Sequence, residues 1–103
     1  MSMGLGPSTA SAVLTVATTV VCTGPALLNN LMLHPGSAAS TLTVYDNATS
    51  ASGNVLAILQ GVANGASVIF PFDDSPPQAA KGLTCVVSGT GAQAQVYFQP
   101  SSL

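Results

Sequence analysis

A regular alternation of apolar and polar side chains runs near the C-terminus, in the stretch Ala92-Gln93-Ala94-Gln95-Val96-Tyr97-Phe98-Gln99. Successive residues of a β-strand point to opposite faces, so this order gives one apolar and one largely polar side. Such a strand is typical of an antiparallel sheet that packs one face on a core and leaves the other in water. The stretch therefore favours a β fold with a layered core.

Short runs rich in β-branched and aromatic residues also alternate with turn residues in the rest of the chain. The expected strands cover residues 13–22, 27–34, 41–46, 54–60, 66–72, 83–88 and 92–99. The run from Leu27 to His34 also fits a helix, but its flanking Gly-Pro and Pro-Gly pairs leave too few residues for a stable one. The sequence predicts an all-β fold, a single antiparallel β-sandwich of seven to eight short strands, either a jelly roll or immunoglobulin-like.

Two turn signals suggest how the strands connect. Asn64-Gly65 is the strongest hairpin signal in the chain, and Gly89-Thr90-Gly91 is expected to join the last two strands as a hairpin. In the strand over residues 54–60, alternation predicts Leu56 and Ile58 on one side.

The chain is short enough for one domain. We expect residues 11–103 to form the β-sandwich domain and residues 1–10 to form an extended N-terminal arm, because glycine and proline interrupt that segment. An arm of this kind can add a strand to the exposed sheet edge of a neighbouring protein. Its residues Met3, Leu5 and Pro7 are therefore candidate interface residues.

Charged side chains are nearly absent, with one Lys or Arg and three Asp or Glu among 103 residues and a net charge of −2. A nucleic-acid-binding surface needs clustered basic residues, so we expect no nucleic-acid partner. No apolar run reaches the ~18–20 residues of a membrane-spanning helix, and no basic residue precedes the first such run as in a secretory signal. The surface must be polar through Ser, Thr, Asn and Gln, as in a protein that works within an assembly.

Few residues are suited to catalysis or metal binding. His34 is the one histidine, and no serine lies in a nucleophile motif such as G-x-S-x-G. The oxygen ligands available to Ca²⁺ match no calcium-loop spacing; they are Asp46, Asn47, Asp73 and Asp74. We favour the interpretation that Asp46-Asn47 caps a turn through side-chain to backbone hydrogen bonds. The sequence predicts no enzyme, no cofactor and no metal site.

The two cysteines, Cys22 and Cys85, each lie within an apolar predicted strand. Burial as small hydrophobic side chains is the default for cysteines in such positions. They do not form a C-x-x-C motif, which argues against redox or zinc chemistry. A disulfide would require their strands to be neighbours at a suitable separation, and the sequence leaves that open.

Tyr45 and Tyr97 are predicted to point outward, because each lies opposite the apolar residues of its strand. Tyrosine is favoured at interfaces, where it offers a large contact area at low entropic cost. The two side chains could form a contact patch or could simply pair across strands. We keep both alternatives and count these tyrosines among the candidate interface residues.

Three segments resemble a known family. They are residues 36–53 with the pattern Ser40-x-x-x-Val44-Tyr45-Asp46, residues 63–68, and residues 81–92 with Gly82-Leu83 followed by Ser88-Gly89-Thr90-Gly91-Ala92. Together they resemble short all-β virion proteins from the structural gene clusters of tailed bacteriophages, over about Gly24 to Phe98. The resemblance implies a capsid decoration or cement protein, which binds the outside of a phage head and stabilises contacts between major capsid proteins.

The same resemblance implies the partners and the location. The partner is the major capsid protein. We also expect other copies of this chain as partners, as a homotrimer on a capsid threefold position in preference to a homodimer at a twofold position. The location is the capsid exterior of the virion, after synthesis in the host bacterial cytoplasm. Because related sandwiches occur in tails, the alternative is a tail, collar or fibre-associated module that contacts a receptor or glycan. That alternative predicts Tyr45 and Tyr97 exposed side by side.

Overall fold

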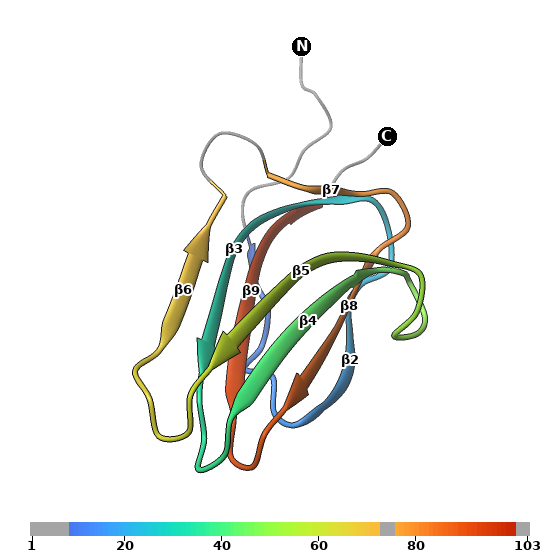
Figure 1. Cartoon of the computed structure of the whole chain (residues 1–103). Coiled ribbons are helices and arrows are strands. Elements are labelled where there is room, and N and C mark those ends of the chain that lie inside the picture. Colours follow the sequence, from blue (N-terminus) through green and yellow to red (C-terminus); the bar gives the residue numbers. More distant parts are fainter. Residues whose placement is uncertain (1–8, 73–75, 101–103) are drawn as a thin grey trace.

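A computed structural model describes residues 9–72 and 76–100, which fold into two antiparallel sheets packed face to face (Figure 1). The strands are β1 (Thr9–Ala10), β2 (Ala17–Cys22), β3 (Ala26–His34), β4 (Ser40–Asp46), β5 (Asn54–Gly61), β6 (Val68–Pro71), β7 (Gln78–Ala79), β8 (Leu83–Ser88) and β9 (Gln93–Pro100). The first sheet has the order β1-β9-β3-β6, and β7 also pairs with β3. The second sheet has the order β2-β8-β4-β5.

This strand order is that of a jelly roll. The antiparallel partners are β1 with β9, β2 with β8, β3 with β6 and β4 with β5. The chain therefore forms a long two-stranded ribbon, closed at the loop between β4 and β5 and folded over into two layers. An all-β antiparallel sandwich is confirmed. The described residues form nine strands rather than seven to eight, because β1 and β7 are separate strands of two residues each.

Both expected hairpins are wrong. Asn64 does adopt a left-handed turn conformation, with φ 55°, but it lies between β5 of one sheet and β6 of the other. Gly89-Thr90-Gly91 likewise joins β8 to β9, which belong to different sheets. Turn residues fix the local reversal of the chain but not the sheet that the next strand joins, and a jelly roll crosses between its layers at both points.

The single strand expected over residues 13–22 is divided between the two sheets. Leu14 exchanges two backbone hydrogen bonds with Ala94 of β9, at 2.8 and 2.9 Å. By contrast, β2 begins at Ala17 and pairs with β8 in the other sheet. The β-branched composition continues through this corner, so composition alone gives no sign of the break.

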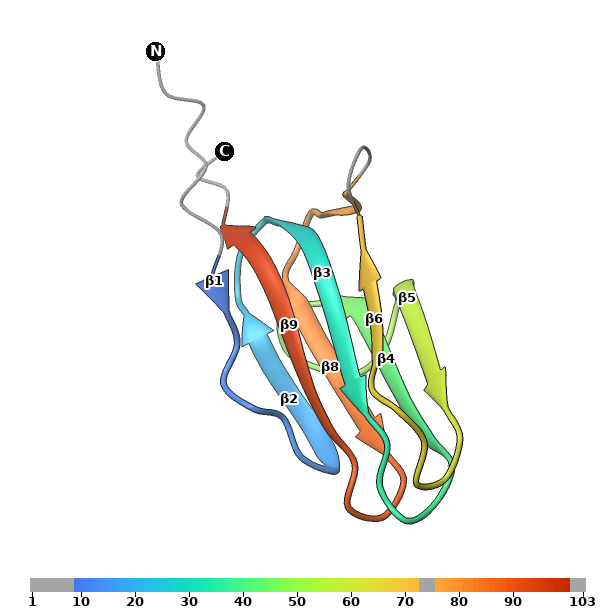
Figure 2. The same cartoon turned by 90° about the vertical axis from the view of Figure 1, so that its left-hand side faces the viewer.

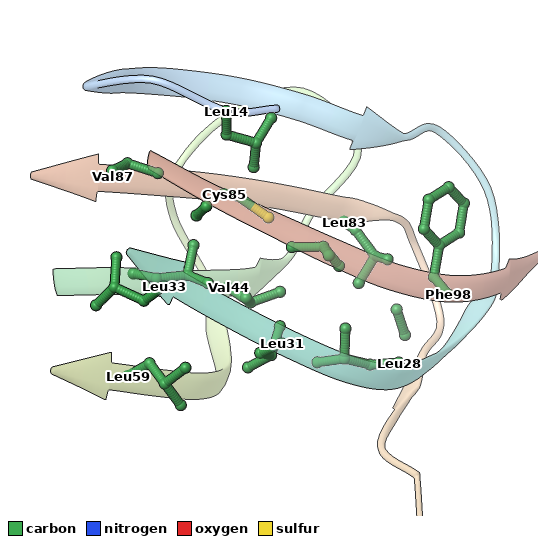
Figure 3. Packing of buried hydrophobic residues seen from close by; sticks show 14 of the residues in the cluster. Leu14, Leu28, Leu31, Leu33, Val44, Leu59, Leu83, Cys85, Val87 and Phe98 are labelled. Carbon is green, nitrogen blue, oxygen red and sulfur yellow. The ribbon is translucent and has the colours of Figure 1, made fainter. Parts of the chain in front are cut away.

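The core lies between the sheets and consists mostly of aliphatic side chains (Figure 3). The buried face of β9 is the apolar row predicted from the sequence, with Ala94, Val96 and Phe98 all buried. The opposite sheet contributes Leu42, Val44, Leu83, Cys85 and Val87. The prediction of a half-buried antiparallel strand at the C-terminal end is thus confirmed.

Two β-bulges change which residues face the core. In β3, the register shifts after Leu28, so that Leu28 and Leu31 are both fully buried, and the expected strand, not a helix, forms there. In β5, the register shifts at Leu56, so that Leu59 is buried and Ile58 is exposed. The expectation that Leu56 and Ile58 share one side is wrong, because a bulge adds one residue and inverts the alternation beyond it.

Candidate interaction surface

Asp46 and Lys81 are the charged side chains of the described residues, and both belong to one end of the sandwich, where Asp46 binds the backbone of Lys81. The Asp46 carboxylate accepts the backbone N–H groups of Lys81 at 2.9 Å, Ala80 at 3.1 Å and Gly82 at 3.4 Å. Desolvation raises the pKa of this carboxyl, but the three backbone donors and the Lys81 charge outweigh it, so the pKa lies below its usual value. Asp46 therefore holds the end of β4 against the turn before β8.

Asn47 caps the loop between β4 and β5, and the predicted turn cap is confirmed. Its Oδ1 accepts the backbone N–H groups of Thr49 at 2.8 Å and Ser50 at 2.9 Å. The other two candidate calcium ligands, Asp73 and Asp74, lie outside the described residues. Within residues 9–72 and 76–100, no group of three or more His, Cys, Asp or Glu side chains could hold a metal ion.

His34 is exposed at the end of β3, and its Nδ1 lies 2.9 Å from the hydroxyl of Ser67. Asp46, the aspartate in the described part of the chain, lies at the far end of β4 and binds backbone groups there. The described residues therefore assemble no Ser-His-Asp arrangement. A hollow of about 310 Å³ lies beside the histidine; it is lined by Val13, Met32, His34, Ser67, Gln93, Ala94 and Gln95.

Both cysteines are free thiols. Cys85 is fully buried in the core, and burial raises the pKa of its thiol to about 12. Cys22 is half-buried, and its Sγ–H donates to the carbonyl of Gly24 at 3.4 Å. Their strands, β2 and β8, are hydrogen-bonded neighbours, but Cys22 faces Leu83 in the register and Cys85 faces Thr19. Cys85 is thus a core residue rather than a reactive one.

Tyr45 and Tyr97 lie on opposite sides of the sandwich. Tyr45 belongs to β4 in the second sheet, where its cross-strand partners are Thr84 and Val55. Tyr97 belongs to β9 in the first sheet, where it pairs with Ala10 and Asn30. Both are half-buried and point away from the core, so the two rings do not form one patch. Each lies among cross-strand neighbours.

The other candidate interface residues, Met3, Leu5 and Pro7, lie outside the described residues. At residue 9 the chain is already part of the first sheet, because Thr9 and Ala10 pair with Phe98 and Tyr97.

Exposed apolar side chains that the sequence pattern did not predict lie along one side of the sandwich, where β5 and β6 are the outermost strands of their sheets (Figure 2). The exposed large side chains of these two strands are Val55, Ile58, Ile69 and Phe70. We call this set the β5–β6 surface. It could not be found from alternation, since the bulge at Leu56 is what turns Ile58 outward.

Comparison with known proteins gives no relationship: no family model, curated protein or solved structure matches the chain. In the part of the chain that the structure describes, no helix is long and apolar enough to cross a membrane.

Proposed function

We propose that this chain is a structural virion protein, a decoration protein that binds the outer surface of a phage head. It bridges neighbouring copies of the major capsid protein and stabilises their contacts. The observation that carries the proposal is the chemistry of the surface: the described residues fold into a jelly roll that carries two charged side chains, Asp46 and Lys81, both at one end.

A cement protein works through contact area and hydrogen bonds rather than through a reactive site. The exposed outer face of the second sheet suits this role, because it presents uncharged residues only, among them Thr18, Val20, Ile58 and Gln60. Contacts between uncharged groups are insensitive to salt, since ionic strength screens charge pairs and not apolar contacts. Jelly rolls are common in viral capsid and lectin domains, which supports the proposal at the level of fold analogy.

A tail, collar or fibre-associated binding module is the second candidate. The hollow beside His34 favours it, because His34, Ser67 and Gln93 supply hydrogen-bonding groups around an apolar Val13 and Met32. A receptor or glycan would contact such a group of polar and apolar side chains. The placement of Tyr45 and Tyr97 on opposite sides counts against the aromatic patch that this candidate predicts.

The copy number of the protein in purified particles tests the proposal. The band of this chain is scaled against the major capsid protein by quantitative gel analysis, with intact-mass detection because Lys81 is the single tryptic site. A ratio near one, or a simple fraction of one, supports a place on the head lattice. A ratio of a few per cent supports the tail candidate. Absence from the particles contradicts both.

A salt wash of the same particles separates neutral from charge-driven attachment. We expect the protein to stay bound when particles are moved from low salt to about 1 M salt, where the screening length falls to roughly 3 Å. Release at high salt would mean that ion pairs hold the protein, which contradicts the argument from the uncharged surface.

A further inference from the structure

The two sheets end in strands of unequal length. In the first sheet one edge is β1, with two residues, and the other is formed by β6, with four residues that include Pro71, and by β7, with two residues. In the second sheet the edges are β2, with six residues and a register shift, and β5, with eight residues. Short strands, prolines and bulges are the features that protect an edge from pairing with another chain. β5 is the longest of these edge strands.

The β5 edge also lacks protective residues. Its sequence, Asn54 to Gly61, contains no charged residue and no proline. Its bulge lies near one end, which leaves Ala57 to Gly61 as a regular segment. Val55 and Ile58 are 47% and 55% exposed beside this edge. An edge strand with free backbone groups and exposed apolar side chains is a template for another strand.

We propose that β5 of this chain pairs antiparallel with β5 of a second copy about a twofold axis. The backbone donors and acceptors along an exposed edge are spaced to pair with another extended strand. A copy of the same edge supplies such a strand, because antiparallel pairing about a twofold axis is self-complementary. The result is a continuous eight-stranded sheet with the order β2-β8-β4-β5-β5-β4-β8-β2 across the two copies.

The first sheet fits the same twofold pairing. β6 lies on the same side of the sandwich as β5 (Figure 2), and its Ile69 and Phe70 are 60% and 49% exposed. A twofold axis at the β5 edge, perpendicular to the sheet, brings the β6 edges of the two copies toward each other. Ile58 points to the outer face of the second sheet and gains cross-strand apolar neighbours from the second copy, whereas Ile69, opposite Met32, points to the outer face of the first sheet.

The absence of charge on the β5–β6 surface does not oppose the binding of a second copy, and it does not favour a charged partner of another kind. The β5–β6 surface carries no charged side chain, so two identical surfaces meet without like-charge repulsion. The same neutrality offers nothing to attract an acidic or basic partner. This inference does not depend on the capsid assignment, and it gives a twofold dimer, the alternative ranked below a homotrimer in the sequence analysis.

Sedimentation equilibrium of the purified chain, over a range of concentrations, tests the pairing. We expect a dimer of twice the 10.1 kDa chain mass. Ile58→Lys places a charge in the middle of the edge and should raise the dissociation constant at least roughly tenfold. The matched control is Val20→Lys, an apolar-to-lysine change at an exposed position of β2, the opposite edge of the same sheet. It should leave the dimer intact.

Disulfide trapping gives a second readout that does not depend on a lysine variant folding well. In a Cys22→Ser background, cysteine is introduced separately at the exposed positions Val55, Ile58 and Gln60 of β5, and at Val20 as control. Because an axis through β5 passes close to at least one of the three positions, we expect one of them to give a covalent dimer on oxidation. The Val20→Cys variant should not.

Several outcomes would overturn the pairing. A wild-type chain that stays monomeric at all concentrations excludes it. A trimer lost in both lysine variants indicates head-to-tail pairing of β5 with β2, and open-ended aggregates indicate unspecific edge association. A covalent dimer through the Val20→Cys variant alone would move the interface to the other edge. None of these results bears on particle copy number, so this inference and the proposed function fail separately.

Discussion

The carboxylate of Asp46 accepts the backbone N–H of Lys81 at 2.9 Å, although 35 residues separate the two in the chain. The interaction joins the end of β4 to the turn that starts β8, its hydrogen-bonded neighbour in the second sheet. The Asp46 side chain therefore links the neighbouring strands β4 and β8 at this end of the second sheet, and the stability of this end depends on the charge of Asp46.

We expect stability to fall in acid through Asp46. The folded-state pKa of Asp46 lies below the usual value of about 3.9. The stabilisation that the ionised carboxylate provides is therefore complete above that value, and it is lost as pH falls through the lower pKa of the folded state. Asp46→Asn should cost about 1 kcal/mol at neutral pH and should flatten the loss in acid. The measurement is Tm from neutral pH to about pH 2. Identical pH profiles for wild type and variant would contradict this role.

Lys81→Gln is the control for the charge of the partner. It keeps the backbone N–H that Asp46 accepts and removes only the side-chain charge, which is the smallest of the contributions that lower the pKa. We therefore expect a smaller change in the pH profile than Asp46→Asn produces. A larger effect from Lys81→Gln would mean that ion pairing, not backbone hydrogen bonding, holds this end together.

Gly89 should be intolerant of a side chain. Its φ of +105° is rarely adopted by other residues, and an added Cβ would lie 2.6 Å from the carbonyl oxygen of Ala39. We expect Gly89→Ala to lower the free energy of unfolding by about 1–3 kcal/mol. Gly24→Ala is the matched control, because nothing lies within 4 Å of its added Cβ. Denaturant unfolding measures both, and equal losses would refute the argument.

The two thiols should differ in reactivity. Burial raises the pKa of Cys85 to about 12, and its side chain is fully buried, so thiolate and access are both lacking at about pH 8. Half-buried Cys22 should react. Mass spectrometry after iodoacetamide treatment should show one adduct on the native chain and two after denaturation. Two adducts without denaturation would show that the core around Cys85 opens readily, and Cys22→Ser should remove the native adduct.

The periodicity of the sequence predicted what depends on neighbouring residues. The alternation from Ala92 to Phe98 specified the buried face of β9, and the turn residues at Asn64 and Gly89 marked real reversals. Asn47 capped its loop as expected, since an Asx cap is a contact between residues two or three apart. All of these are short-range features.

What the sequence did not predict depends on long-range pairing. Whether the strand after Gly89 joins the same sheet as β8 or the opposite one is decided by which partner strand completes the core. The bulge at Leu56 likewise depends on the register of β4 against β5, which no local pattern reports. The β5–β6 surface depends on the assignment of strands to sheets and on this bulge, so the sequence alone did not predict it. The sequence pointed instead to Tyr45 and Tyr97.

The orientation of β5 can be tested with two neighbouring residues. Leu59 is 6% exposed and faces the core, whereas Ile58 points outward beside Thr43. Leu59→Ala should cost about 2–5 kcal/mol because it leaves a cavity, and Ile58→Ala should change the unfolding free energy of the monomer by less than about 0.5 kcal/mol. Denaturant unfolding at low protein concentration, where self-association does not contribute, measures both variants. The opposite ranking would restore the alternation in which Ile58 faces the core, and it would remove the exposed apolar residue on which the β5 pairing depends.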